Sequence, residues 1–153
     1  MKLEQWASIA EIVGSFAVVV TLVVLLVEVR GNTAAVQAAT YNNVVESITT
    51  TLNERGADAD LTRIWLAGNA REPLEPIDQD RYESLVGANM RRFENAFYQY
   101  QIGGIEESQW EPIKNIIAFL MSSSGHRLWW SNTRTLYSAE FQDLVDSLEA
   151  AEN

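Results

Sequence analysis

The pattern of hydrophobic and polar positions along this chain changes near residue 30. From Ile12 to Val27 the sequence reads IVGSFAVVVTLVVLLV, without a charge or a proline. Beyond Gly31, apolar residues recur at three- and four-residue steps with polar residues between them, which is typical of amphipathic helices. The pattern therefore predicts two parts, a membrane anchor over residues 1–30 and an α-helical soluble domain over residues 31–153.

The apolar run is long enough to cross a bilayer. From Trp6 to Val27 it holds 22 residues, so as a helix it spans roughly 33 Å, against a hydrocarbon core of about 30 Å. Twelve of its residues between Ile12 and Val27 are Ile, Val, Leu or Phe, and they favour insertion by roughly 4 to 7 kcal/mol. We expect an uncleaved single-pass anchor. The alternative is a cleaved signal peptide, whose apolar core extends to only about 15 residues.

Helical periodicity and helix-breaking residues divide the rest of the chain. The first helix is expected to leave the bilayer and continue to about Asn53, and Gly31 is where a bend would fall. Further helices are expected over residues 60–67, from a cap at Asp78 to residue 100 or 101, over 108–121, around Leu128 to Leu136, and after a cap at Ser138. The predicted fold class is all-α, an N-terminal transmembrane helix that continues into a soluble helical bundle.

Small residues line one side of the anchor and continue in phase beyond it. The predicted oligomer interface consists of Ala10, Gly14, Ala17, Thr21, Gly31, Ala34, Ala38 and Tyr41. Small residues on one face let two membrane helices approach closely, and a seam of this spacing, which runs on through Val45, Ile48 and Leu52, suits a parallel oligomer. The alternative is that the alanines after Gly31 pack on this chain's own bundle.

Composition excludes several classes of function. The net charge is −10, of which the predicted soluble domain carries −9, and an acidic surface disfavours nucleic acid as a partner. Cysteine is absent and His126 is the only histidine, so no familiar zinc site can form. There are no paired Glu-x-x-His motifs for a di-iron bundle and no phosphate-binding glycine loop. We expect no cofactor and no catalytic or metal-ligating residues.

A few side chains are candidates for a polar site: Glu11, Glu94, Tyr98, Arg127 and Trp129. Glu11 would face a polar pathway, or lie at the headgroups as an interface residue. Glu94 would be an acid with a raised pKa, or the partner of Arg92, Arg127 or Arg134, and we favour the ion pair. Trp129 and the adjacent Trp130 cannot both face inward on one helix, so one of them should lie at a rim.

Several short motifs resemble those of a group of small bacterial single-span membrane proteins of uncharacterised function. The matching residues are Leu3 to Trp6, Arg30, Asn32, Thr33, Ala35, Phe93, Glu94, Tyr98, Gln99, Gly104, Trp110, Gly125 to Arg127, Trp129, Trp130 and Ser138 to Phe141. The resemblance covers most of the chain and brings no activity with it. It implies the bacterial inner membrane. Such proteins commonly carry several basic residues after the span, which implies a cytoplasmic domain, but this chain has only Arg30 there, balanced by Lys2.

These observations favour a non-enzymatic, membrane-anchored module that binds protein partners or forms homo-oligomers. The partners expected are the lipid bilayer and either a second copy or another membrane protein. One alternative is a small oligomeric channel or transport accessory, with Glu11 near a polar pathway. Another is a small-molecule sensor or enzyme with a pocket near Glu94.

Overall fold

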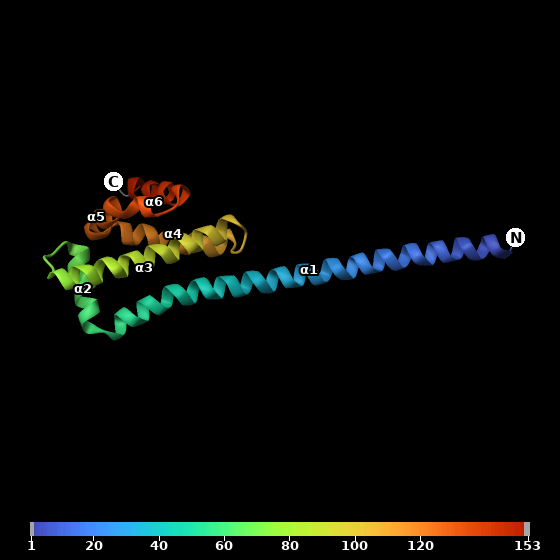
Figure 1. Ribbon diagram of the computed structural model, residues 1–153, viewed down its shortest axis with the longest axis horizontal. Coiled ribbons are helices and arrows are strands. Elements are labelled where there is room, and N and C mark those ends of the chain that lie inside the picture. Colours follow the sequence, from blue (N-terminus) through green and yellow to red (C-terminus); the bar gives the residue numbers. More distant parts are fainter. Residues whose placement is uncertain (1, 152–153) are drawn as a thin grey trace. The chain divides into compact units, whose positions relative to one another are not determined.

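The computed structural model describes the backbone of residues 2–151 and the side chains of Trp6, Glu11 and residues 13–149. Every regular element among the described residues is a helix (Figure 1), so the prediction of an all-α chain is confirmed. The elements are α1 Lys2–Ala57, α2 Ala59–Ala70, α3 Pro76–Gln101, α4 Glu107–Met121, α5 Ser124–Thr133, the 3-10 helix η1 Arg134–Leu136, and α6 Ala139–Ala151. Contacts between residues divide the chain after Ala38. We call residues 2–38 the N-terminal segment and residues 39–151 the helical domain.

Within the N-terminal segment, the stretch from Val13 to Val27 exposes its large apolar side chains. Between Val13 and Val27, the exposed fraction of the large apolar side chains runs from 45 % at Val20 to 69 % at Phe16. By length and composition, α1 is the one described helix that could cross a membrane, a criterion that a signal sequence also meets. This stretch is helical, and its large apolar side chains are not buried in a core.

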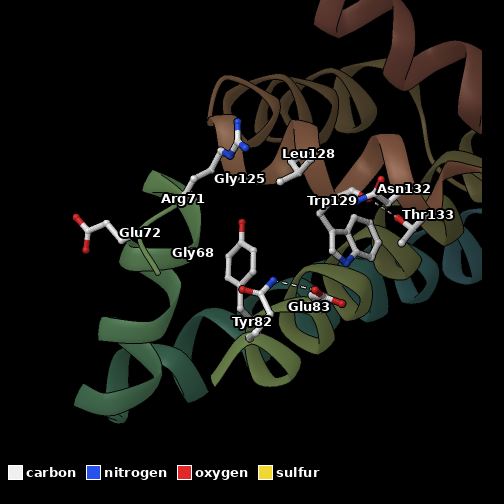
Figure 2. A pocket seen from close by; sticks show the side chains of 11 residues that line it. Gly68, Arg71, Glu72, Tyr82, Glu83, Gly125, Leu128, Trp129, Asn132 and Thr133 are labelled. Carbon is white, nitrogen blue, oxygen red and sulfur yellow. Dashed lines mark hydrogen bonds between the residues drawn. The ribbon is translucent and has the colours of Figure 1, made fainter. Parts of the chain in front are cut away.

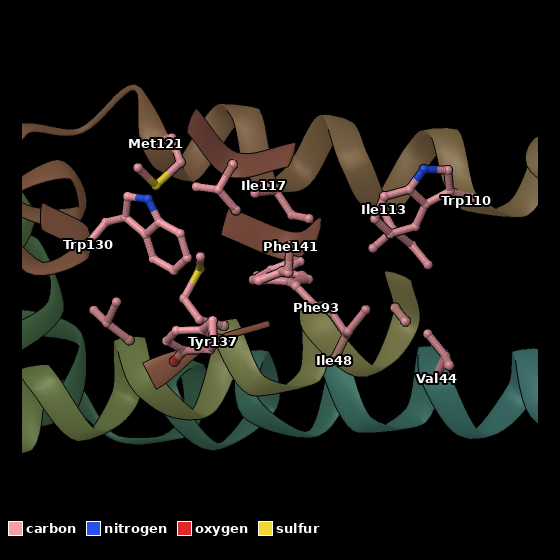
Figure 3. Close-up of a cluster of buried hydrophobic side chains, with 14 of the residues drawn as sticks. Val44, Ile48, Phe93, Trp110, Ile113, Ile117, Met121, Trp130, Tyr137 and Phe141 are labelled. Atoms are coloured by element: carbon pink, nitrogen blue, oxygen red, sulfur yellow. The ribbon is translucent and has the colours of Figure 1, made fainter. Parts of the chain in front are cut away.

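The helical domain is built around the buried face of α3. Tyr82, Val86, Met90, Phe93 and Ala96 recur at three- and four-residue steps along this helix, and all five are buried. The helices α4, α5 and α6 add buried residues to the same core (Figure 3), among them Trp110, Ile113, Ile117, Met121, Trp130, Phe141 and Val145. The spacing matches the helical period, so each helix contributes one face.

Phe141 of α6 is fully buried at the meeting point of three aromatic rings. Its ring centroid lies 6.0 Å from Phe97, 6.0 Å from Trp130 and 5.8 Å from Tyr137. Aromatic rings at these separations bury much apolar area and add a favourable ring–ring term. The C-terminal helix is therefore fixed to the domain by aromatic packing.

The face that the end of α1 buries in this core differs from the stripe that continues the predicted oligomer seam. The buried positions are Val44, Ile48 and Thr51, and Leu52 is exposed. The buried face thus contains Val44 and Thr51 in place of Val45 and Leu52, and shares only Ile48 with the stripe. The domain buries the small, polar Thr51 while the larger, apolar Leu52 is exposed, so hydrophobicity alone does not identify the face of α1 that packs on the core.

Two helix starts also differ from the prediction. The helix α3 begins at Pro76, with Glu75 as its N-cap residue, so Asp78 lies in the first turn and is not the cap. Proline is favoured at that first position because its missing N–H would have no partner there. The helix α5 begins at Ser124, because the hydroxyl of Ser123 accepts a hydrogen bond from the backbone N–H of His126.

Candidate functional site

Helices α2 and α5 approach each other at two glycines. A Cβ atom on Gly125 would overlap the backbone carbonyl oxygen of Gly68 and lie 2.7 Å from the hydroxyl oxygen of Tyr82. A Cβ atom on Gly68 would overlap the Tyr82 ring. Only glycine permits backbones to pass this closely, so the two glycines hold Tyr82 between α2 and α5.

A hollow of about 270 Å³ lies beside this contact. Figure 2 shows the side chains of Arg71, Tyr82 and Trp129 around it. The other lining residues are Gly68, Glu72, Gln79, Glu83, Gly125, Leu128, Asn132 and Thr133. The amide of Gln79 donates to Glu83 at 2.8 Å. Charges of both signs line this hollow, from Arg71, Glu72 and Glu83.

His126 is fully buried next to the hollow. Its Nδ1 atom lies 2.9 Å from the hydroxyl oxygen of Ser123, and its ring centroid lies 5.0 Å from that of Trp65. Burial, with a smaller effect from the positive charge of Arg55, lowers the pKa of His126 to about 4. The imidazole is therefore neutral near pH 7. No group of three His, Cys, Asp or Glu residues that could hold a metal ion occurs in the described part of the chain.

Glu94 serves as an anchor for the start of α6. Its carboxylate accepts hydrogen bonds from the backbone N–H of Ser138 and from the guanidinium of Arg91, both at 2.8 Å. Burial raises the pKa of Glu94, but the bonds from Ser138 and Arg91 outweigh it and the net pKa lies below the usual value. Glu94 is ionised and paired, as the favoured reading predicts. Its partner is Arg91, and the three arginines proposed from the sequence are not its partners.

Two of the three arginines proposed as partners of Glu94 bind other groups. Arg127 donates to the carbonyl oxygens of Met121 and Ser122, at 3.0 and 2.7 Å, and so satisfies the end of α4. Arg134 pairs with Asp146. Both contacts join neighbouring helices of the domain, which makes these arginines structural.

The structure does not gather the four polar candidates of the helical domain into one site. Trp129 is half-buried and lines the hollow of Figure 2, whereas Trp130 is fully buried, so the prediction that one of the two lies at a rim is confirmed. Glu94, Tyr98 and Arg127 do not line that hollow, and Tyr98 is exposed.

The candidates of the N-terminal segment are exposed. Glu11 shares one side of α1 with Ser15, Phe16 and Val19. The small residues Gly14, Ala17, Thr21, Gly31, Ala34 and Ala38 are also exposed, and the side chain of Ala10 lies outside the described residues. Tyr41, the last residue of the predicted interface, belongs to the helical domain and packs against its core.

A second cavity, here called the apolar cavity, has a volume of about 340 Å³ and belongs to the helical domain. Its lining comes from four helices and the loop after α4: Ile48, Leu52, Arg55, Trp65, Leu66, Asn69, Asn89, Phe93, Ile116, Phe119, Leu120, Ser122 and Ser123. Sequence reasoning missed this site. The one signal was Phe119, an aromatic residue off the buried face of α4, which is defined by Trp110, Ile113 and Ile117.

No family model matches the chain, and neither a curated protein nor a solved structure matches it.

Proposed function

We propose that this protein is a membrane-anchored, non-enzymatic interaction module. In this proposal the N-terminal segment crosses the bilayer once, and the helical domain is a bundle that binds protein partners or a second copy. The observation that carries the proposal is the exposure of every large apolar side chain described between Val13 and Val27. So much contiguous apolar surface is unfavourable in water and is typical of a lipid or protein contact.

The length and charge of the run favour lipid over a protein groove. The uncharged stretch from Ile12 to Val27 follows directly on Glu11 and is followed by Glu28 and Arg30. Charges at both ends with none between them suit a segment whose ends reach water and whose middle does not. Glu11 then lies near the headgroups.

Two added charges test the anchor. A central arginine costs about 2.5 to 3.5 kcal/mol, so the double variant Val19→Arg/Val23→Arg should cancel most of the insertion energy. We expect the unaltered protein to remain in the membrane pellet after alkaline carbonate extraction and this variant to be released. The matched control is Asn42→Arg/Asn43→Arg, which adds the same charge to the exposed polar side of α1 and should stay in the pellet. Release of the unaltered protein would contradict the proposal.

Self-association is proposed to use the small residues of the N-terminal segment. A Cβ atom at Gly14 meets nothing within 4 Å, so Gly14→Leu leaves the chain's own contacts intact and adds bulk only to a helix–helix contact. We expect an oligomer by light scattering in detergent and a shift to monomer in Gly14→Leu or Ala38→Glu. Val20→Leu, which lies off the small-residue side, is the control. A monomeric unaltered protein would remove the oligomer from the proposal and leave the anchor in place.

We further propose that the membrane is the bacterial inner membrane and that the helical domain is cytoplasmic. The resemblance to small single-span bacterial proteins supports the membrane. Lys2 and Arg30 balance each other across the span, so orientation needs its own experiment. The chain has no cysteine, so a cysteine placed at the exposed Glu107 reports its side alone. An impermeant maleimide should label it only after the inner membrane is opened. Labelling of intact spheroplasts would contradict a cytoplasmic helical domain and place it on the outer side of the inner membrane.

A further inference from the structure

The apolar cavity contains a single charged side chain, Arg55 at the end of α1. The centre of its guanidinium lies 4.3 Å from the ring centroid of Trp65. No carboxylate of the described residues forms an ion pair with it. Burial lowers the pKa of Arg55, which means that the cation has lost water. In a chain of net charge −10, a cation that faces a cavity without an acid beside it favours an anionic ligand.

Two side-chain amides in the cavity have unused hydrogen-bonding capacity. Asn89 is 8 % exposed, and its amide has no hydrogen-bond partner among the described residues. Asn69 accepts a bond from the hydroxyl of Tyr82 at 3.1 Å, but its NH₂ group has none within the same part of the chain. Both side chains line the cavity. Neither amide is among the fully buried side-chain atoms without a partner, so both groups reach open space, and the amides can donate to a ligand in the cavity that Arg55 also lines.

The rest of the cavity suits an apolar body. Ile48 and Phe93 form buried parts of the lining, whereas Leu52, Leu66 and Phe119 are exposed large apolar side chains, with Phe119 exposed to 73 %. These three come from α1, α2 and α4. Exposed apolar residues around a concave surface are typical of ligand sites. The volume of about 340 Å³ lies near the lower end of the range for small-molecule sites, about 300–1,000 Å³. It therefore suits one short chain or ring.

We propose that the apolar cavity binds a small amphiphilic anion, a carboxylate on one short aliphatic chain or aromatic ring. The carboxylate accepts hydrogen bonds from Arg55 and Asn89, and the apolar body packs on Ile48, Phe93 and Phe119. The charge-assisted bond to arginine gives selectivity for an anion over a neutral molecule of the same shape. This site is separate from the hollow of Figure 2 and from the candidates near Glu94.

Calorimetric titration with octanoate and 1-octanol tests the proposal, because the two probes share a chain and differ in charge. The full chain is used in nanodiscs of zwitterionic phosphatidylcholine, and empty nanodiscs correct for partition into lipid. We expect saturable 1:1 binding of octanoate at pH 7 and at least tenfold weaker binding of octanol. Arg55→Gln should weaken octanoate at least tenfold and leave octanol within twofold. Equal affinities for the two probes, or an unchanged octanoate affinity in Arg55→Gln, would overturn the proposal.

A pair of exposed positions keeps the test decisive if Arg55→Gln fails to fold, since Arg55 stacks on Trp65. Leu66 lines the cavity and is 62 % exposed, and Ile77 is an apolar residue of comparable exposure, 72 %, that does not line it. We expect Leu66→Ser to weaken both probes at least threefold and Ile77→Ser to change neither. Equal effects of the two substitutions, or heat no greater than that of empty nanodiscs, would overturn the site. Disulfide cross-linking of Phe119→Cys between two copies, without octanoate binding, would overturn it in favour of a second chain.

Discussion

Val23 in α1 and Val86 in α3 are both valines within helices, yet the side chain of Val23 is 55 % exposed and that of Val86 is 0 % exposed. The difference lies in what surrounds each helix. Around Val86, the polar positions of α3 face water and its apolar positions face α4 and the neighbouring helices. Around Val23, the helix carries no charge from Ile12 to Val27, and the large apolar side chains described between Val13 and Val27 are all exposed. The helical domain therefore contains its own core, whereas the N-terminal segment exposes apolar side chains that would be more stable out of water.

Removal of one aromatic ring from each region should give the largest difference in the free energy of unfolding. Phe141→Ala should reduce the free energy of unfolding of the helical domain by about 3 to 5 kcal/mol, because it leaves a cavity among Phe97, Trp130 and Tyr137. Phe16→Ala should leave that free energy unchanged, since Phe16 is exposed. Urea denaturation followed by tryptophan fluorescence measures both. A similar loss in the two variants would show that Phe16 packs against the domain.

Glycine substitutions give the next largest effect. In Gly125→Ala the new methyl group overlaps the carbonyl oxygen of Gly68, and because backbone cannot move aside cheaply we expect a loss of about 3 kcal/mol. Gly14→Ala meets nothing within 4 Å and favours its helix by about 1 kcal/mol. Thermal unfolding followed by circular dichroism compares the two variants. An unchanged midpoint in Gly125→Ala would contradict the close approach of α2 and α5.

The buried histidine makes the stability of the helical domain depend on pH. The pKa of His126 is about 4 in the folded chain and about 6.5 when unfolded. The unfolded state therefore binds more protons between these values, and stability falls as the pH falls. From pH 7 to pH 5 we expect a loss of roughly 2 kcal/mol.

Because His126 is the only histidine in the chain, one variant isolates this effect. His126→Phe should flatten the dependence of the urea midpoint on pH between 5 and 7. The lowered pKa of Glu94 acts in another window, since its contribution is present above its unfolded pKa and is lost only at more acidic pH. A slope that persists in His126→Phe would assign the dependence to other groups.

The smallest expected effect concerns the polar surface of the helical domain. Glu94→Gln weakens the hydrogen bonds to Ser138 and Arg91 and should cost about 1 kcal/mol. Glu111→Gln removes a more exposed ion pair with Lys114 and should cost less than about 0.5 kcal/mol. Urea denaturation of both variants checks the order. Equal costs would mean that the bond from Glu94 to the start of α6 contributes nothing beyond an exposed pair.

Sequence reasoning found the helices because their signals are local. Gly103 ends α3 with a positive φ and Pro112 lies in the first turns of α4, and each acts on the backbone within a few residues. The exact starts of α3 at Pro76 and of α5 after Ser123 were not predicted. Local signals did not reveal which face of the end of α1 is buried, because the polar Thr51 is buried and the more hydrophobic Leu52 is exposed. The choice between them depends on packing against distant helices.

The candidate site was less accessible to prediction. Glu94 and Arg91 are three residues apart and could have been paired by helical spacing, but the bond from Ser138 spans 44 residues. The apolar cavity joins Leu52, Asn89 and Phe119, which lie on three helices. No spacing rule within one helix relates such residues, and only the packed domain brings them together.

Site-directed spin labelling tests most directly whether the N-terminal segment lies in lipid. The chain has no cysteine, so labels at Val20→Cys and at the exposed Glu140→Cys each report a single site. In phosphatidylcholine vesicles, we predict that the label at position 20 collides readily with oxygen and rarely with a water-soluble nickel complex, and that the label at position 140 shows the reverse. Equal access of the nickel complex to both labels would contradict the membrane anchor.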